Sequence, residues 1–139
     1  MKFIMLMKNA EHLRVLPKEL DDAIRQISGD SSKGVVVSNG ALARSADGCR
    51  IRISGGELSV LDGPFTETKE VVGGFGILEY KSKPEALEGA RRFMELYRKH
   101  WPGWEGEMEI RQILAPEEYA LEAQQGAAAV SEKLKSSQG

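Results

Sequence analysis

A sharp corner in the chain is encoded by Asp62-Gly63-Pro64-Phe65-Thr66-Glu67-Thr68-Lys69-Glu70, which leads into Gly73-Gly74-Phe75. Pro64 has no amide hydrogen for a strand ladder, and Gly63 tolerates a positive φ, so an extended run must stop here. The Asp62 side chain can accept backbone amide hydrogens in the turn that it begins. The stretch therefore predicts a turn between two strands, and the rest of the fold is read on either side of it.

The residues before this turn predict a β-hairpin. Apolar side chains alternate with charged or polar ones in Arg50–Ile53 and again in Leu58–Val60, and Gly55-Gly56 stands between the two runs. One face of the hairpin is therefore expected to be wet, because arginines occupy it. After the turn, Phe75–Tyr80 resumes an extended run.

Hydrophobic periodicity outlines the remaining elements. An apolar run predicts a buried strand at Lys2–Lys8, and the helical spacing of apolar residues predicts a helix from about Pro17. A second helix should begin at the capping box Ser82-Lys83-Pro84-Glu85. Further strands are expected at Val35–Val37 and Glu107–Ile113, and a last helix is expected from Pro116, with an end that frays.

The order of these elements matches a ferredoxin-like α+β domain with an extra hairpin in the middle. We expect this domain to occupy residues 1–114, and a C-terminal helix with a frayed tail to occupy residues 115–139. One four-stranded sheet with two helices leaves an apolar face uncovered, and a second copy of the chain is the expected cover. The sequence thus predicts a homodimer.

Size and charge argue against several classes of function. With 139 residues, 41% of them hydrophobic and 29% charged, the chain fits one globular domain. The formal net charge of -2 provides no basic surface for nucleic acid, and the apolar run Phe3–Met7 is too short for a signal segment or a membrane span. We therefore expect a cytoplasmic protein that binds neither nucleic acid nor membrane directly.

The sequence predicts neither a metal nor a cofactor. Cys49 is the only cysteine, so it has no intrachain disulfide partner, and neither His12 nor His100 has a second ligand at metal-binding spacing. The run Gly73-Gly74-Phe75-Gly76 lacks the spacing of a dinucleotide fingerprint, and the sequence contains no P-loop motif.

The turn from Asp62 to Glu70, together with Gly73-Gly74-Phe75, closely resembles the signature of the DGPF proteins, a branch of the YCII-related group. The resemblance covers the order of elements from Met1 to about Gln112. It implies that two ferredoxin-like units pair into a dimeric α+β barrel, and that the first helix continues to about Lys33 although Gly29 would stop it on propensity. Members of the family often accompany extracytoplasmic-function sigma factors, which implies a role in signalling.

The resemblance also implies a chemistry from which this chain departs. Some YCII-related proteins are thought to act as dehydrochlorinases or related lyases, through a histidine and an aspartate. No match for that histidine is evident here. Many DGPF relatives also carry Gly-Glu-Gly-Leu where this chain has Asn39-Gly40-Ala41-Leu42. The acid is missing, which weakens the transfer of carboxylate chemistry to the first half of the chain, although the Asn39 amide can still bind a ligand.

Each candidate ligand-binding residue also has a structural interpretation. Glu67 and Lys69 would either project into a pocket at the cleft of the dimer or form an exposed ion pair worth only about 0 to 1 kcal/mol. Trp101 and Trp104 would either roof a pocket or pack in the core or at an interface. The complete candidate set is Asn39, Asp62, Phe65, Glu67, Lys69, Glu70, Trp101 and Trp104.

Three functions remain open from the sequence. The first is a dimeric accessory or regulatory protein that binds a small polar or aromatic molecule between sheet and helices. The second is an enzyme, either a YCII-like lyase or a cofactor-free oxygenase, in which Glu67, Lys69 or His100 would transfer protons. The third is a protein-interaction module whose C-terminal helix docks on a partner.

Overall fold

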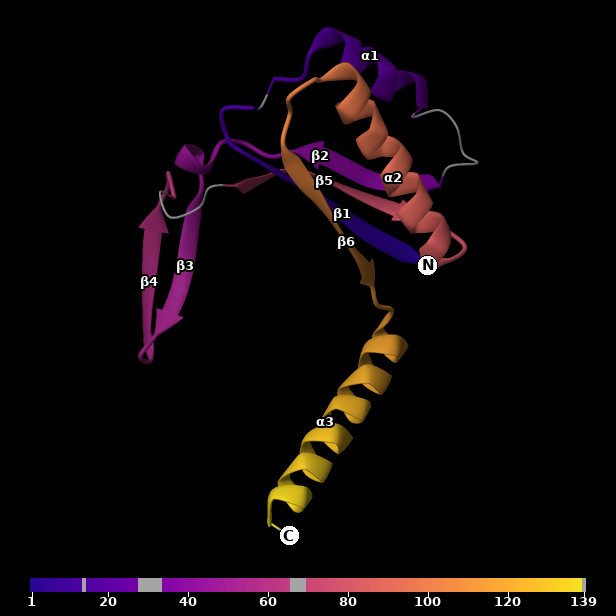
Figure 1. The fold of residues 1–139 in the computed structure, drawn as a ribbon. Coiled ribbons are helices and arrows are strands. Elements are labelled where there is room, and N and C mark those ends of the chain that lie inside the picture. The colour runs from indigo at the N-terminus through magenta and orange to yellow at the C-terminus, as the bar shows by residue number, and fades with distance from the viewer. Residues whose placement is uncertain (14, 28–33, 66–69, 139) are drawn as a thin grey trace.

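The computed structural model describes residues 1–13, 15–27, 34–65 and 70–138. In chain order the elements are β1 (Lys2–Asn9), α1 (Lys18–Ile27), β2 (Val35–Ala41), a short 3-10 turn (Ser45–Asp47), β3 (Cys49–Ser54), β4 (Glu57–Asp62), β5 (Val71–Glu79), α2 (Lys83–His100), β6 (Gly106–Ile113) and α3 (Pro116–Gln138). Figure 1 shows the main sheet with α1 and α2 on one side, while the β3–β4 hairpin and α3 stand away from it. The predicted α+β class is confirmed.

The main sheet has the strand order β2-β5-β1-β6, and each neighbouring pair is antiparallel. This order is compatible with the predicted ferredoxin-like fold, in which the first and third strands of a βαββαβ chain lie at the centre. Along β1, Phe3 and Met5 are 1% and 6% exposed and face the helices. Ile4 and Leu6 alternate with them and therefore face the opposite side of the sheet.

The core lies between the sheet and α2. Phe3 and Met5 pack with Tyr80, Ala86 and Ala90 in one buried cluster. Ala86 and Ala90 are one helical turn apart, so they share a face of α2, and their small side chains let the helix approach the strands closely. The ring of Tyr80 meets that of Phe3 edge to face, with 6.3 Å between the ring centres.

Local sequence signals position both covering helices. The Ser82 hydroxyl accepts the amide hydrogen of Glu85 at 3.3 Å, as the capping box predicts, so α2 begins where expected. Leu20 is fully buried and anchors α1. The two ends predicted for the first helix, near Gly29 or near Lys33, both lie outside the described residues.

The β3–β4 hairpin forms a separate two-stranded sheet. Its base is tied to the loop after β1 by Glu11, whose carboxylate accepts hydrogen bonds from the backbone amide and the hydroxyl of Ser45, the latter at 2.8 Å. The predicted alternation is confirmed by the register, in which Ile51 lies opposite Val60. The sequence leads us to expect one wet face, but in the single chain the apolar face is exposed as well.

The last helix, α3, carries the chain away from the sheet (Figure 1). Its first turn is capped by Glu118, which accepts hydrogen bonds from the amide of Ala115 and the side chain of Gln112, both at 3.1 Å. Large apolar side chains such as Tyr119 and Val130 are exposed along it. Within the described part of the chain, no helix combines the length and apolar character needed to cross a membrane. The division at residue 114 and the fraying of the tail stay predictions.

Two helical glycines make a matched test of how α2 packs. A methyl group at Gly89 would lie 2.3 Å from the hydroxyl oxygen of Tyr80, a buried side chain, whereas one at Gly126 in α3 would meet nothing within 4 Å. Gly89→Ala is expected to lower the free energy of unfolding by roughly 1 to 3 kcal/mol, measured by urea denaturation. Gly126→Ala should instead favour the helix. A Gly89→Ala variant as stable as the wild type would contradict this packing.

Candidate ligand pocket

A pocket of about 740 Å³ lies between the sheet and its covering helices. Residues of the central and edge strands line its floor, and α1, α2 and the segment before α1 supply its walls. Most lining side chains are aliphatic, aromatic or methionine, among them Met5, Met7, Leu13, Ile24, Leu78, Phe93 and Met108. A volume of this size with an apolar lining is typical of a small-molecule site.

Glycines of β5 create the hollow. Gly74 and Gly76 lie opposite Met7 and Met5 of β1, on the side of the sheet that faces the helices, and both line the pocket. Neither glycine has a side chain to fill the space above the sheet, so the layer between β5 and the helices stays open. In the sequence, the run Gly73-Gly74-Phe75-Gly76 marks the floor of this pocket. The spacing rules for phosphate-binding glycines do not detect such a run.

Polar side chains also line the pocket. Asn9 donates from Nδ2 to the backbone carbonyl oxygen of Leu13 at 2.8 Å, and Asn39 contributes a second amide from β2. Arg92 lines the pocket from α2, and its Nε donates to Glu88 at 3.0 Å. Hydrogen bonds from Arg91 and Arg92 lower the pKa of Glu88 to about 2. The lining therefore offers amides and a guanidinium, which bind acceptors and anions.

An aromatic cluster borders the pocket at the C-terminal end of α2. Tyr97 stacks on Trp101 with 6.5 Å between ring centres, and it contacts Trp104 at 4.7 Å. Trp101 is among the lining residues, whereas Trp104 packs beside them, and its indole Nε1 is buried without a hydrogen-bond partner among the described atoms. Burial raises the pKa of Tyr97 above its usual 10.0, so its hydroxyl stays protonated at neutral pH.

The described lining residues include no histidine and no carboxylate. His100 lies in a separate shallow depression with Glu19 and Asp22 of α1, and His12 is exposed in the loop after β1. Within the described ranges, no three His, Cys, Asp or Glu side chains are grouped to hold a metal ion. Histidine and carboxylate side chains are common general acids and bases, whereas the polar side chains of the described lining are amides, a guanidinium and tyrosine hydroxyls.

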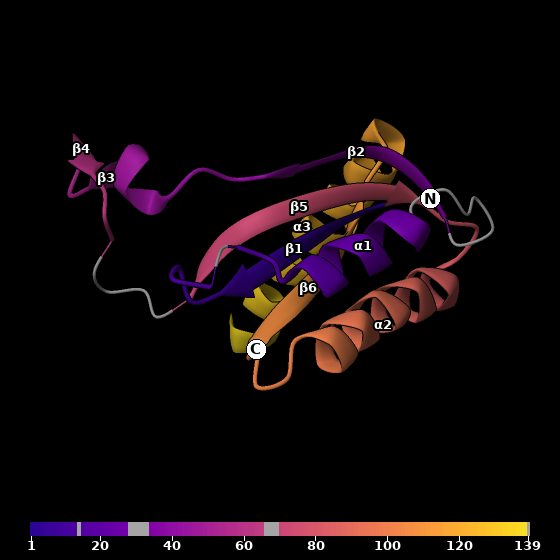
Figure 2. The same cartoon turned by 90° about the horizontal axis from the view of Figure 1, so that it is seen from above.

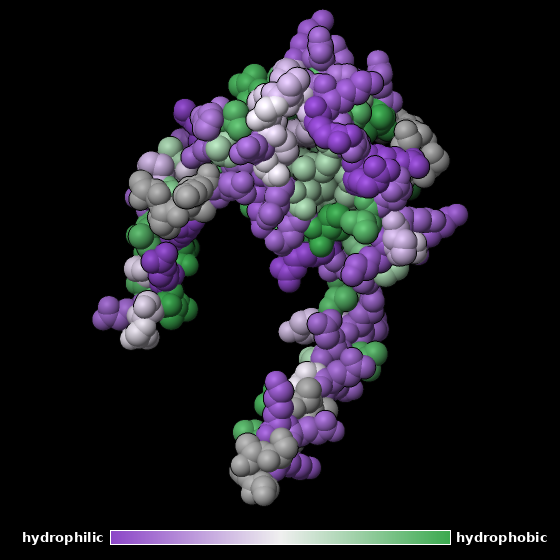
Figure 3. All heavy atoms as spheres, in the orientation of Figure 1, coloured by the Kyte–Doolittle hydropathy of each residue, from purple (hydrophilic) through white to green (hydrophobic). Residues whose placement is uncertain are grey.

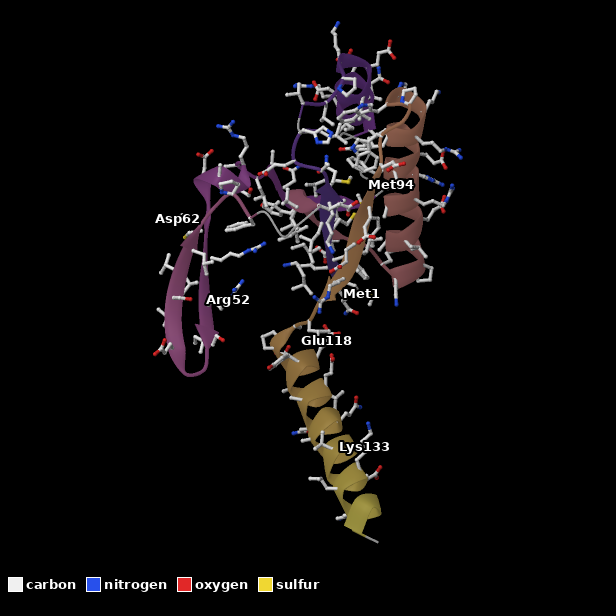
Figure 4. The ribbon with its side chains drawn as sticks, turned by 60° about the vertical axis from the view of Figure 1, so that its left-hand side comes forward. Met1, Arg52, Asp62, Met94, Glu118 and Lys133 are labelled. Atoms are coloured by element: carbon white, nitrogen blue, oxygen red, sulfur yellow. The ribbon has the colours of Figure 1, made fainter. Side chains whose placement is uncertain are left out.

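The turn at Asp62–Phe65 builds the base of the hairpin. The Gly63 amide donates to the carbonyl oxygen of Gly48 at 3.0 Å, which closes the ladder. The guanidinium carbon of Arg50 lies 3.8 Å from the centre of the Phe65 ring, at cation–π distance, and Phe65 is half-buried. Figure 4 shows Asp62 at this base, away from the helices that cover the sheet. In the described residues the turn therefore has a structural role.

The predicted site residues do not all converge. Asn39 and Trp101 line the pocket, and Trp104 packs beside Trp101. Asp62 and Phe65 lie at the base of the hairpin, and Glu70 is exposed just before β5. Glu67 and Lys69 lie outside the described residues. The glycines of β5, Asn9 and Arg92 are pocket residues that the sequence analysis did not name as ligand-binding. Ligand binding by any of these residues stays a prediction.

Comparison with known proteins establishes the family. The sequence family model of the YCII-related domain matches residues 1–95, which include β1 to β5 and most of α2. This chain belongs to the YCII-related family. The membership inferred from the turn sequence is thereby confirmed, and the narrower likeness to the DGPF branch stays a resemblance. The match covers most of the pocket, whereas the lining residues Leu96, Tyr97, Trp101 and Met108 lie beyond it.

A relative of this YCII-related chain is an uncharacterized protein of Rhizobium meliloti (strain 1021), which is 39% identical over 79 residues. The aligned region covers 53% of this chain and 64% of the relative, so it spans less than two thirds of that protein. The relative's name states no activity and no ligand. The similarity therefore supports the family and transfers no function.

The turn of this YCII-related chain can be tested at Gly63. A methyl group there would lie 1.7 Å from the carbonyl oxygen of Ser45, so the backbone would have to move. Gly63→Ala should loosen the base of the hairpin and lower the hydrogen-exchange protection of its amides by at least about tenfold. Gly48→Ala is the matched control, because its methyl group would lie 3.5 Å from the same oxygen. Equal protection in the two variants would refute the tight contact.

The two buried tyrosines predict a loss of stability in alkali. Burial raises the pKa of Tyr80 and of Tyr97 above the usual 10.0. For each tyrosine the folded-state pKa exceeds the unfolded-state pKa. The free energy of unfolding that the two protonated hydroxyls contribute is therefore fully present below pH 10.0, and it is lost as the pH rises through the folded-state pKa values. The slope is at most about 1.4 kcal/mol per pH unit for each tyrosine. Urea unfolding on both sides of this pH measures it, and Tyr97→Phe should reduce the slope.

Proposed function

We propose that this YCII-related protein is a homodimer that binds a small molecule with an aromatic or apolar body. The pocket lining carries the proposal, because its described residues are mainly apolar and aromatic and add Asn9, Asn39 and Arg92 as polar groups. A fitting ligand buries its apolar body against methionine and aromatic side chains. It directs a hydrogen-bond acceptor or an anionic group toward the amides and the guanidinium.

The same lining favours binding over the alternative of a lyase or an oxygenase. A side chain transfers protons most efficiently when its pKa lies near the operating pH. The described lining has neither a histidine nor a carboxylate, and the raised pKa of Tyr97 makes its hydroxyl a poor base. The accessory role that we propose, close to sigma-factor signalling, rests on the family resemblance alone.

The proposed dimer uses the side of the sheet that α1 and α2 leave uncovered. Ile4, Leu6 and Ile77 share this side and are half-buried. Beside them, Lys8 donates to Glu109 at 2.7 Å, and this hydrogen bond holds the pKa of Glu109 below its usual range. An apolar centre next to paired charges suits a self-complementary interface between identical copies.

Ligand binding is tested by thermal shift with a panel of aromatic carboxylates and neutral aromatic compounds. A ligand present at about 100 times its Kd stabilises the folded state by roughly 2.7 kcal/mol, which raises Tm by several degrees. Met7→Trp fills the pocket and should abolish the shift. Val15→Trp, at a position that is 86% exposed and outside the lining, should leave it unchanged. A panel without any stabilising compound at millimolar concentration would count against the pocket.

The dimer is tested by sedimentation of the full chain over a range of concentrations. Leu6→Lys places a charge on the proposed interface and should raise the dimer Kd by at least about 100-fold. Leu87→Lys is the matched control, because Leu87 is 60% exposed on α2, away from that side of the sheet. Identical association of both variants and the wild type would eliminate the sheet-face dimer.

A further inference from the structure

The apolar face of the β3–β4 hairpin has no cover within the described part of the chain. The face consists of Ile51, Ile53, Leu58 and Val60, which are opposite one another in two cross-strand pairs. Their exposed fractions are 67%, 73%, 68% and 61%. Figure 3 shows apolar side chains at the surface of the hairpin. A lone two-stranded hairpin is only marginally stable in water, so this face requires a partner.

The hairpin projects on the side of the sheet that lacks helices. Figure 1 shows the hairpin and α3 extending in the same direction from two ends of the sheet. Figure 2, seen from above, places α1 in front of the strands and α3 behind them. The uncovered side of the sheet, with Ile4 and Leu6, therefore lies between the hairpin and α3. Whatever covers this side of the sheet is flanked by the hairpin.

The charges of the two surfaces are compatible with a second copy of the chain as the cover. The uncovered side of the sheet pairs Lys8 with Glu109 at 2.7 Å and with Glu107 at 3.8 Å. The hairpin residues Cys49–Asp62 contain two arginines balanced by one glutamate and one aspartate. Neither surface has an excess of one sign that would repel an identical copy or collect the phosphates of a nucleic acid.

We propose that the apolar face of the hairpin packs against a second copy of this chain and forms an arm of the dimer interface. The inference rests on the sheet-face dimer proposed above and adds the hairpin to it. It also gives the signature turn a purpose. The Gly63 amide donates to the carbonyl oxygen of Gly48 and closes the base of the arm, and Glu11 ties this base to the loop after β1 by accepting hydrogen bonds from Ser45.

Neighbouring residues of β4 provide a matched pair of variants. Val60 lies on the apolar face, and Ser59 lies opposite Arg52 on the other face. In the full chain, Val60→Asp should raise the dimer Kd by at least about 30-fold, because it buries a carboxylate in the interface. Ser59→Asp adds the same charge to the same strand and should change Kd by less than about threefold. Sedimentation over a range of concentrations measures both.

The outcomes separate this inference from the proposal on which it rests. A wild-type chain that is monomeric at every concentration overturns both the sheet-face dimer and the arm. A wild-type dimer whose Kd responds equally to Val60→Asp and Ser59→Asp overturns the arm alone. A selective loss of association in Val60→Asp, with Ser59→Asp unaffected, supports the arm.

A second measurement uses the wild-type chain and does not depend on the folding of a variant. Hydrogen exchange of the amides in Cys49–Ser54 and Glu57–Asp62 is followed above and below the dimer Kd, with the amides of α2 as the reference. The arm predicts at least about tenfold greater protection of the hairpin in the dimer. Protection that is independent of concentration would overturn it.

Discussion

The main sheet has two sides, and the described chain brings helices to only one of them (Figure 1). Fully burying a leucine or isoleucine side chain contributes about 1.5 to 3 kcal/mol, whereas a whole domain is stable by only about 5 to 15 kcal/mol. Ile4 and Leu6 are half-buried and the apolar face of the hairpin is more exposed still, so covering these side chains would add a sizeable fraction of that total. The second copy proposed above would cover these side chains.

Successive residues of β5 contribute to the two proposed functions of the sheet, ligand binding on one side and dimerisation on the other. Gly74 and Gly76 face the helices, where their missing side chains leave the pocket open. Ile77 faces the other side, beside Ile4 of β1, where the second copy is proposed to lie. Successive side chains of a strand point to opposite faces, so one short segment supplies both a pocket floor and part of an interface.

The fold was readable from the sequence because it depends on local signals. Period-two alternation gave the hairpin, the capping box gave the start of α2, and apolar runs gave β1 and β6 to within about two residues, the accuracy at which boundaries are defined. The pocket was not readable, because its residues come from elements far apart in the chain. Asn9 ends β1, whereas Arg92 lies in α2 among other exposed charges, and no spacing rule links the two.

Asp62 and Phe65 of the signature drew attention as ligand contacts, yet both lie at the base of the hairpin, where Phe65 contacts Arg50. The loop after β1 connects that hairpin to the pocket, because Glu11 accepts hydrogen bonds from Ser45, while Asn9 and Leu13 on either side of it line the pocket and are bonded to each other. A movement of the loop after β1 would displace the base of the hairpin, because the carboxylate of Glu11 is hydrogen-bonded to the hydroxyl of Ser45. Coupling of ligand binding to dimerisation requires that both favour the same position of the loop. Since the loop belongs to the pocket and to the hairpin base at once, it is the element where such a preference has a direct physical route.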